Sequence, residues 1–481
     1  MLLTGGGDEQ LSAIKYHLIP YTRGKHGIEL GRGPFKAFPQ FLGIREKDDP
    51  TLDGVKPDLE IESFAKLRDS IKDDSLDFVF AWGDVAIDAQ IVASVLRNGG
   101  YFIDCTRPAH IVSRKDDDEL SPVAELEVDA ALVGRKPTAC IVRYGAIGDQ
   151  LQSAALLHAL AEEGYHITWM CEPTGELVMR HDPRIDRFYI QNKDQVPNDE
   201  LMAYWAVQRT KYDKWINLCE TVEGTLLAMP GRMLYEFSHE ARHAVCDHNY
   251  LEFQAKVAEL PFRPEHRFYA SDEEEARSKR FIARIAEGMN PGWGIGQRWI
   301  KPYVVMFALA GSSVHKTYPH MDAVVDWILV EIPNAHVVFV GDDACRLLEC
   351  NYTEHERVTC ASGEMDLRDT LTLARHCDLV IGPETGVLNC VAFEANAKIV
   401  LLSHSSHENL TKHWNNTDAL HASGVPCYPC HQLHSTFDKC WEHEESGTAM
   451  CQWKLGPEGV IAAVKRAYTA TGTVRRLLEA A

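Results

Sequence analysis

Three turns that follow short apolar runs hold the residues of this chain that are best suited to chemistry. In IGPETGVLNCVA, residues 381–392, an apolar run at 379–381 enters a turn with Glu384 and Thr385, and a helix is predicted from about Gly386. The free N–H groups of a helix start and the Thr385 hydroxyl can bind phosphate oxygens. The same turn also occurs in α/β domains that bind no ligand, so this loop alone leaves both interpretations open.

Two further segments have the same form. After the predicted strand at 140–144, small residues at Gly145 and Gly148 let a ligand approach the backbone, and Asp149 precedes a helix predicted from about Gln150. Asp149 is placed to act as a base at a strand end, or to cap the helix. After the apolar run at 303–309, Lys316 stands close to Ser312 and Ser313. A compact cation with neighbouring hydroxyl donors suits a pyrophosphate group.

These segments belong to four blocks that resemble, in order, those of the bacterial heptosyltransferases of glycosyltransferase family nine. The blocks are IVRYGAIGDQLQSAALLHAL, HDPRIDRFYI, LAGSSVHKTYPHMDAVVDWI and the stretch from 358 to 402. The resemblance extends from about residue 137 to about residue 468. It implies a GT-B fold, in which two Rossmann-like domains face each other across the donor and acceptor sites.

The resemblance also implies roles for individual residues. Asp149 matches the general base for the acceptor hydroxyl, Lys316 assists catalysis at the diphosphate, and Gly145 and Gly148 belong to the acceptor-side loop. The implied donor-binding residues are Ser312, Ser313, Lys316, Glu384, Thr385, Gly386 and Asn389. Glu384 stands where the family usually has Asp, and Asn389 where it usually has His, so the sugar and the nucleotide stay open.

Length and periodicity predict a multi-domain α/β protein. We expect a small module at 1–134, an acceptor domain with its linker at 135–300, and a donor domain at 301–481 with a cysteine-rich loop at 425–452. Ser271 and Glu274 have the spacing of a capping box, and the glycine- and proline-rich stretch that follows, residues 288–302, is predicted to be a linker.

Composition narrows the class of protein. The net charge is −21, which argues against a broad electrostatic surface for nucleic acid. No apolar run reaches the ~18 residues of a membrane span, and the start, MLLTGGGDEQ, lacks the features of a secretory signal. We therefore expect a cytoplasmic protein without a membrane span.

Four of the 14 cysteines form a separate pattern. Cys427, Cys430, Cys440 and Cys451 give C-x2-C-x9-C-x10-C, a spacing that can close a tetrahedral site for structural iron or zinc. The pattern is similar to the four-cysteine iron finger of the autotransporter heptosyltransferase branch, with different spacing. Four unliganded thiols are the alternative, and nearby histidines could replace a thiol: His431, His434 and His443.

The first 134 residues resemble a class I methyltransferase that has degenerated. The evidence is an incomplete glycine turn from Gly27 to Gly33, followed by strand-like runs at 77–80 and 96–103. We expect a structural or acceptor-recognising module and no binding of S-adenosylmethionine. The acidic run KDDDEL, residues 115–120, is predicted to be the solvated linker out of the module.

Together these features predict an inverting glycosyltransferase that transfers a heptose or hexose by direct displacement, without a catalytic metal. The expected donor is a nucleotide diphosphate sugar similar to ADP-heptose. The acceptor is a glycan or a protein, with a hydroxylated DNA base left open, and the chain can form a homo-oligomer. The alternatives are an S-adenosylmethionine-dependent methyltransferase that carries a sugar-nucleotide-binding module, and a non-catalytic GT-B binding protein.

Overall fold

The computed structural model divides the chain into two compact units, Met1–Thr138 and Ala139–Ala481. Each unit is described by itself. Among the described residues, no helix is long and apolar enough to cross a membrane. The residues that the structure describes are 21–22, 26–31, 42–47, 57–82, 85–106, 110–117, 119–126, 136–192, 195–219, 221–222, 224–291 and 299–480.

The N-terminal unit is built on a seven-stranded sheet with the order β3-β2-β1-β4-β5-β6-β7. The first five strands are parallel, and β6 and β7 add an antiparallel hairpin. The strands are β1 Gly27–Leu30, β2 Leu42–Glu46, β3 Leu59–Ile61, β4 Leu76–Trp82, β5 Leu96–Cys105, β6 His110–Asp116 and β7 Glu119–Leu126, with helices α2 Leu67–Ser70 and α3 Ala89–Val95. Arg32 and Gly33 of the predicted glycine turn lie outside the described residues.

The prediction of a solvated linker at 115–120 is wrong, because Lys115 and Asp116 at the end of β6 pair with Leu120 and Glu119 at the start of β7. Lys115 is buried, and its ammonium group donates to Leu96 O at 2.7 Å and to Asp74 Oδ1 at 2.6 Å. An acidic run is usually solvated, but here the one cation within it is neutralised by a carboxylate 41 residues earlier in the sequence. Sequence alone does not reveal such a partner.

The first half of the larger unit has a four-stranded parallel sheet in the order β10-β9-β8-β11. Its strands are β8 Thr138–Val142, β9 His166–Cys171, β10 Arg187–Ile190 and β11 Lys214–Asn217. Its helices are α4 Ile147–Ser153, α5 Leu157–Glu162, α6 Pro173–Met179, α7 Leu201–Arg209, α8 His239–Cys246 and α9 Tyr250–Ala258. The helix predicted near Gln150 begins three residues earlier, at Ile147.

The second half has a six-stranded parallel sheet in the order β14-β13-β12-β15-β16-β17. Its strands are β12 Tyr303–Ala308, β13 Ala335–Val340, β14 Val358–Cys360, β15 Leu379–Pro383, β16 Ala397–Leu401 and β17 Thr417–Leu420. Its helices are α11 Met321–Glu331, α12 Arg346–Glu349, α13 Leu367–His376, α14 Gly386–Val391, α15 Met450–Lys454 and α16 Pro457–Ala480. The strand order reverses between β12 and β15, which is where ligands bind in open α/β sheets.

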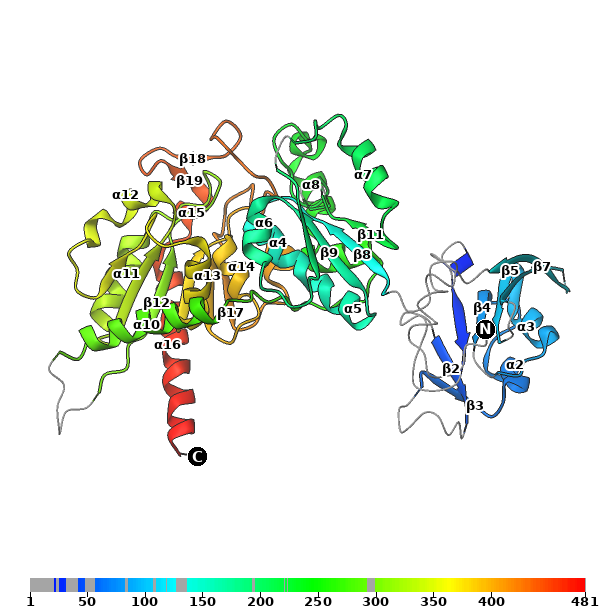
Figure 1. The fold of residues 1–481 in the computed structure, drawn as a ribbon. Helices are drawn as coiled ribbons and strands as arrows, with labels where there is room; N and C mark the ends of the chain where they lie inside the picture. The colour runs from blue at the N-terminus through cyan, green and yellow to red at the C-terminus, as the bar shows by residue number, and fades with distance from the viewer. Residues whose placement is uncertain are drawn as a thin grey trace. The chain divides into compact units, whose positions relative to one another are not determined.

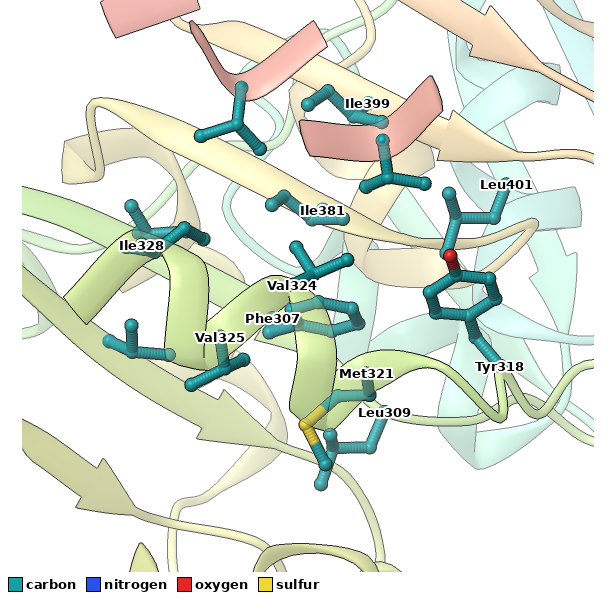
Figure 2. Close-up of a cluster of buried hydrophobic side chains, with 14 of the residues drawn as sticks. Phe307, Leu309, Tyr318, Met321, Val324, Val325, Ile328, Ile381, Ile399 and Leu401 are labelled. Carbon is teal, nitrogen blue, oxygen red and sulfur yellow. The ribbon is translucent and has the colours of Figure 1, made fainter. Parts of the chain in front are cut away.

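One of the two apolar layers of the second half lies between this sheet and α11. Figure 2 shows Val324, Val325 and Ile328 of α11 beside Phe307 of β12 and Ile381 of β15. All five side chains are fully buried. This apolar layer fixes the two strands whose carboxyl ends carry the Lys316 and Glu384 loops.

The two halves form the GT-B arrangement predicted from the sequence, with α4 of one beside α14 of the other (Figure 1). Helix α10, Asp272–Gly288, lies between them in sequence and begins with the predicted capping box: Ser271 Oγ accepts from Glu274 N, and Glu274 Oε2 accepts from Ser271 N. Residues 292–298, the middle of the predicted linker, lie outside the described residues.

Candidate functional site

The predicted acceptor-side loop and the predicted donor loop lie against each other. Gln152 of α4 donates to Asn389 of α14, with Nε2 and Oδ1 2.8 Å apart. A Cβ atom added at Gly148 would lie 3.0 Å from Asn389 Nδ2, and one at Gly386 would lie 2.6 Å from Ile147 Cγ2. An added side chain at Gly386 would therefore displace Ile147, and one at Gly148 would make a tight contact with Asn389, so the two halves approach closely at both helix starts.

Asp149 lies at this junction, and donors of its own half hold its carboxylate. Oδ2 accepts from Ala146 N at 2.8 Å, which makes Asp149 part of the α4 cap, and Oδ1 lies 2.9 Å from Arg143 Nη2. Arg143 is buried, whereas the Asp149 side chain is 25% exposed. Asp149 is thus the third residue of α4 and not its N-cap, but its carboxylate accepts from the N–H of the N-cap residue Ala146 and still reaches solvent.

Lys316 is buried beneath the donor loop. Its ammonium group donates to the main-chain oxygen of Glu384 at 2.8 Å, and its side chain passes over Gly311, where a Cβ would lie 2.6 Å from Lys316 Cδ. Burial lowers the pKa of Lys316 below its ordinary value, while Glu384 and then Asp149 oppose this shift. The fold therefore brings Lys316 and Asp149, 167 positions apart in the sequence, within electrostatic range of each other.

The carboxylate of Glu384 is directed into the protein. Oε1 accepts from Ser403 N at 2.8 Å and from Ser405 N at 3.1 Å, while Ser403 Oγ donates to Oε2 at 2.6 Å. Burial alone would raise the pKa of Glu384, but His404, Lys316 and Ser403 together lower it well below its ordinary value. Glu384 is thus an ionised group that fixes the loop after β16, and sequence reasoning gave no sign of this partner loop.

The remaining predicted donor-site residues differ in what they contact. Thr385 has a buried hydroxyl, and none of the described residues hydrogen-bonds to it. Asn389 has both ends of its amide in use, because Nδ2 donates to Thr385 O at 2.9 Å and Oδ1 accepts from Gln152. Ser312 is exposed and Ser313 is half-buried. Thr385 is therefore the side chain of this loop with a hydroxyl left for a ligand.

The four predicted metal ligands border one cavity of about 30 Å³, together with His315 and His434. Burial raises the pKa of all four thiols, and repulsion from neighbouring thiols adds to this for Cys430, Cys440 and Cys451. Both ring nitrogens of His315 are buried and make no hydrogen bond to any described residue. The donor set therefore has the chemistry of a soft-metal site.

The positions of the sulfur atoms agree less well with such a site. Thiolates on one tetrahedral ion lie roughly 3.8 Å apart, given metal–sulfur bonds of about 2.3 Å. In the described part of the chain, the three-residue group whose ligand atoms all lie within 4.8 Å of one another is His243, Asp247 and His431. The four cysteines are not gathered so closely, and the loop must tighten to hold an ion.

Sequence analysis missed several residues at the junction between the halves. Gln152 and Arg143 give no local signal. His239, His243 and Asp247 do, because they recur every four residues and so lie on one face of a helix. A further groove, of about 760 Å³, lies between α10 and the loop before α13 and is lined by none of the predicted site residues.

No protein-family model matches the chain, and no curated protein matches its sequence. Several solved structures are similar in fold at low identity. The glycosyl transferase family 9 structure from Veillonella parvula DSM 2008 has 15% identity and a TM-score of 0.47, and the match covers 69% of this chain and 97% of that one.

The E. coli ADP-heptose lps heptosyltransferase II has 11% identity, covers 70% of this chain and 99% of its own, and gives a TM-score of 0.47. The iron-containing dodecameric glycosyltransferase TibC from enterotoxigenic E. coli H10407 has 12% identity and a TM-score of 0.44, and the match covers 75% of this chain and 83% of that one. At these values the likeness concerns the fold and assigns neither a substrate nor a reaction. The methyltransferase resemblance of residues 1–134 gains no support from these comparisons and stays a prediction.

Proposed function

We propose that this protein is an inverting glycosyltransferase that moves a sugar from a nucleotide diphosphate donor to an acceptor hydroxyl. The observation that carries the proposal is that the Asp149 loop, with its partly exposed carboxylate, meets the Glu384–Asn389 loop, beneath which the cation of Lys316 is buried. A carboxylate near the acceptor and a cation near the leaving group are the two charges that direct displacement needs.

In the proposed reaction Asp149 accepts the proton of the acceptor hydroxyl as its oxygen attacks the anomeric carbon. The bond from that carbon to the diphosphate oxygen breaks, and the electron pair leaves with the nucleoside diphosphate. Lys316 stabilises the charge that grows on the departing phosphates, and the Thr385 hydroxyl donates to one of their oxygens. Since the carboxylate of Glu384 faces Ser403 and Ser405, its contribution is to position the loop.

The donor is expected to be a nucleotide diphosphate sugar similar to ADP-heptose, because the motifs of the second half match family nine. The acceptor class is a glycan or a protein, and a hydroxylated DNA base stays among the candidates. A panel of nucleotide sugars, tested for donor hydrolysis and for transfer, separates this function from the two alternatives. A methyltransferase or a non-catalytic binding protein would turn over none of them.

Two substitutions test the site itself. Asp149→Asn keeps the shape and an oxygen for the α4 cap, so it should leave donor binding nearly unchanged and lower turnover about 10²–10⁴-fold. Lys316→Ala should weaken nucleoside diphosphate binding in calorimetry and also slow transfer. Lys398→Met is a matched control, because Lys398 is a buried lysine that donates to the main-chain oxygens of Glu394 and Asn396. Normal turnover by folded Asp149→Asn would refute the assignment of the base.

We also propose that Cys427, Cys430, Cys440 and Cys451 hold one structural iron or zinc ion. The shared cavity and the unpartnered His315 beside it support this, and four thiolates leave no open position for substrate. Cys451→Ser should then lower both the metal content and Tm while leaving the chemistry at Asp149 in place. Elemental analysis of the intact protein that finds neither metal near one equivalent would contradict the proposal.

A further inference from the structure

A second group of possible metal ligands lies where α8 of the first half meets the start of the cysteine-rich loop, residues 425–452, which is called the cysteine segment below. His243 Nδ1 and His431 Nε2 are 3.0 Å apart, and His431 Nε2 lies 3.7 Å from Asp247 Oδ1. The three ligand atoms are all within 4.8 Å of one another. We propose that His243, Asp247 and His431 bind one divalent cation of the zinc type, which joins the two halves.

The separations suit such an ion. Ligands at a tetrahedral zinc ion, with bonds of about 2.0–2.1 Å, lie roughly 3.3 Å apart, and the two measured separations bracket this value. Two imidazole nitrogens and one carboxylate oxygen form a donor set that zinc accepts, with a fourth position left for water. This set contains no sulfur, so it is chemically distinct from the four-cysteine cavity.

The ligands are also positioned by contacts that do not depend on an ion. Helix α8 is fixed to the start of the cysteine segment, because His239 Nε2 donates to Pro429 O at 3.2 Å and Arg242 Nε donates to Cys430 O at 2.6 Å. Ala228 N donates to His431 O at 2.8 Å, and Ser406 Oγ donates to Asp247. A preformed geometry lowers the entropy that binding must overcome.

The ligands differ in their access to solvent. The side chain of His431 is fully buried. His243 is 42% exposed and Asp247 is 25% exposed, so an ion can enter from solvent.

The hydrogen bonds around His431 set the condition for binding. Asn409 Oδ1 accepts from Ser406 N at 2.9 Å, so its amide nitrogen, 2.9 Å from His431 Nδ1, donates to that atom. The His431 proton then lies on Nε2 and points at His243. An ion on Nε2 moves this proton to Nδ1, and Asn409 must turn its oxygen toward it and give up the Ser406 bond. Binding releases no proton but carries this cost, so we expect a readily exchangeable ion.

The test is a Co²⁺ titration of the intact protein, followed by absorption and calorimetry. We expect one equivalent that gives weak visible d–d bands without the near-ultraviolet charge-transfer bands of thiolate ligands. His243→Gln should weaken this binding at least tenfold. His248→Gln should leave it unchanged, because His248 is exposed and is not among the ligands.

The affinity of the Asn409→Asp variant for Co²⁺ distinguishes a metal site from a group of residues that only hydrogen-bond to one another. A carboxylate there can accept from Ser406 N and from His431 Nδ1 together, so it should raise the affinity about tenfold, as outer partners of metal-bound histidine do. The same ion should raise Tm, because its ligands come from both halves. The absence of a sulfur-free equivalent, or the same affinity in His243→Gln as in the unaltered protein, would overturn the proposal.

Discussion

The substitution Arg368→Met is expected to destabilise the larger unit strongly. Arg368 on α13 is 5% exposed and forms two hydrogen bonds to the carboxylate of Glu274 on α10, at 2.6 and 2.8 Å. It also donates to the main-chain oxygens of Leu177 and Val178 at the end of α6, and to that of Tyr269. One side chain therefore joins the second half to both the first half and the connecting helix.

The size of the effect follows from what the substitution leaves behind. Removing one partner of a buried ion pair costs about 3–5 kcal/mol, because the other charge stays buried without compensation. In Arg368→Met, Glu274 keeps only the Ser271 N–H, and three main-chain oxygens lose their donor. The double variant Arg368→Met with Glu274→Gln removes the stranded charge and keeps the cap, so it should recover part of the loss.

The pH dependence gives an independent measure. Burial acts to raise the pKa of Glu274, but the Arg368 hydrogen bond and charge outweigh it and lower the pKa from 4.5 to about 2. A depressed carboxyl pKa contributes stability that is fully present above pH 4.5 and is lost as the pH falls toward 2. A shift of this size corresponds to about 3 kcal/mol, consistent with the cost of breaking the pair.

The assay is urea unfolding at several pH values between 7 and 3, with Arg277→Met as the control. Arg277 pairs with Asp369 across the same two helices, but these side chains are 45% and 24% exposed, so its loss should cost less than about 1 kcal/mol. The reasoning is refuted if Arg368→Met costs no more than the control, or if its loss of stability below pH 4.5 matches that of the unaltered protein.

Two further predictions concern buried carboxylates. Glu384→Gln should weaken nucleoside diphosphate binding and increase hydrogen exchange at Ser403 and Ser405, because an amide cannot accept from both main-chain N–H groups and the Ser403 hydroxyl as the carboxylate does; unchanged exchange would contradict this. Trp82→Phe should cost the N-terminal unit about 1–3 kcal/mol in urea unfolding, because Glu29, fully buried beside Arg45, loses the indole N–H that donates to it at 2.9 Å; a neutral result would contradict this.

Features that depend on neighbouring residues could be predicted from the sequence. The helix start at Gly386, the capping box at Ser271 and Glu274, and the two parallel sheets all follow from local pattern and alternation of strands and helices. Each of these features is determined by residues close together in the sequence, through turn-forming residue types and the spacing of apolar residues.

Features that depend on distant partners could not be predicted. Lys115 is a strand residue of the β6–β7 hairpin, and its ammonium group is bound by Asp74 and by Leu96 O. The direction of the Glu384 carboxylate is set by the Ser403 loop, and His243, Asp247 and His431 meet only because α8 packs against the start of the cysteine segment. In each case the residue type indicated which interactions the side chain could make, but tertiary contacts determined its actual partners.

Asp149 illustrates why a structural role and a catalytic one need not exclude each other. An ionised carboxylate has about four lone-pair positions, and the observed contacts are one bond from Ala146 N and the pair with Arg143. These two contacts fix the plane of the group at the start of α4, and the exposed quarter of the side chain leaves acceptor capacity toward solvent. An aspartate that takes part in a helix cap therefore has a fixed orientation, which a general base needs before an acceptor hydroxyl arrives.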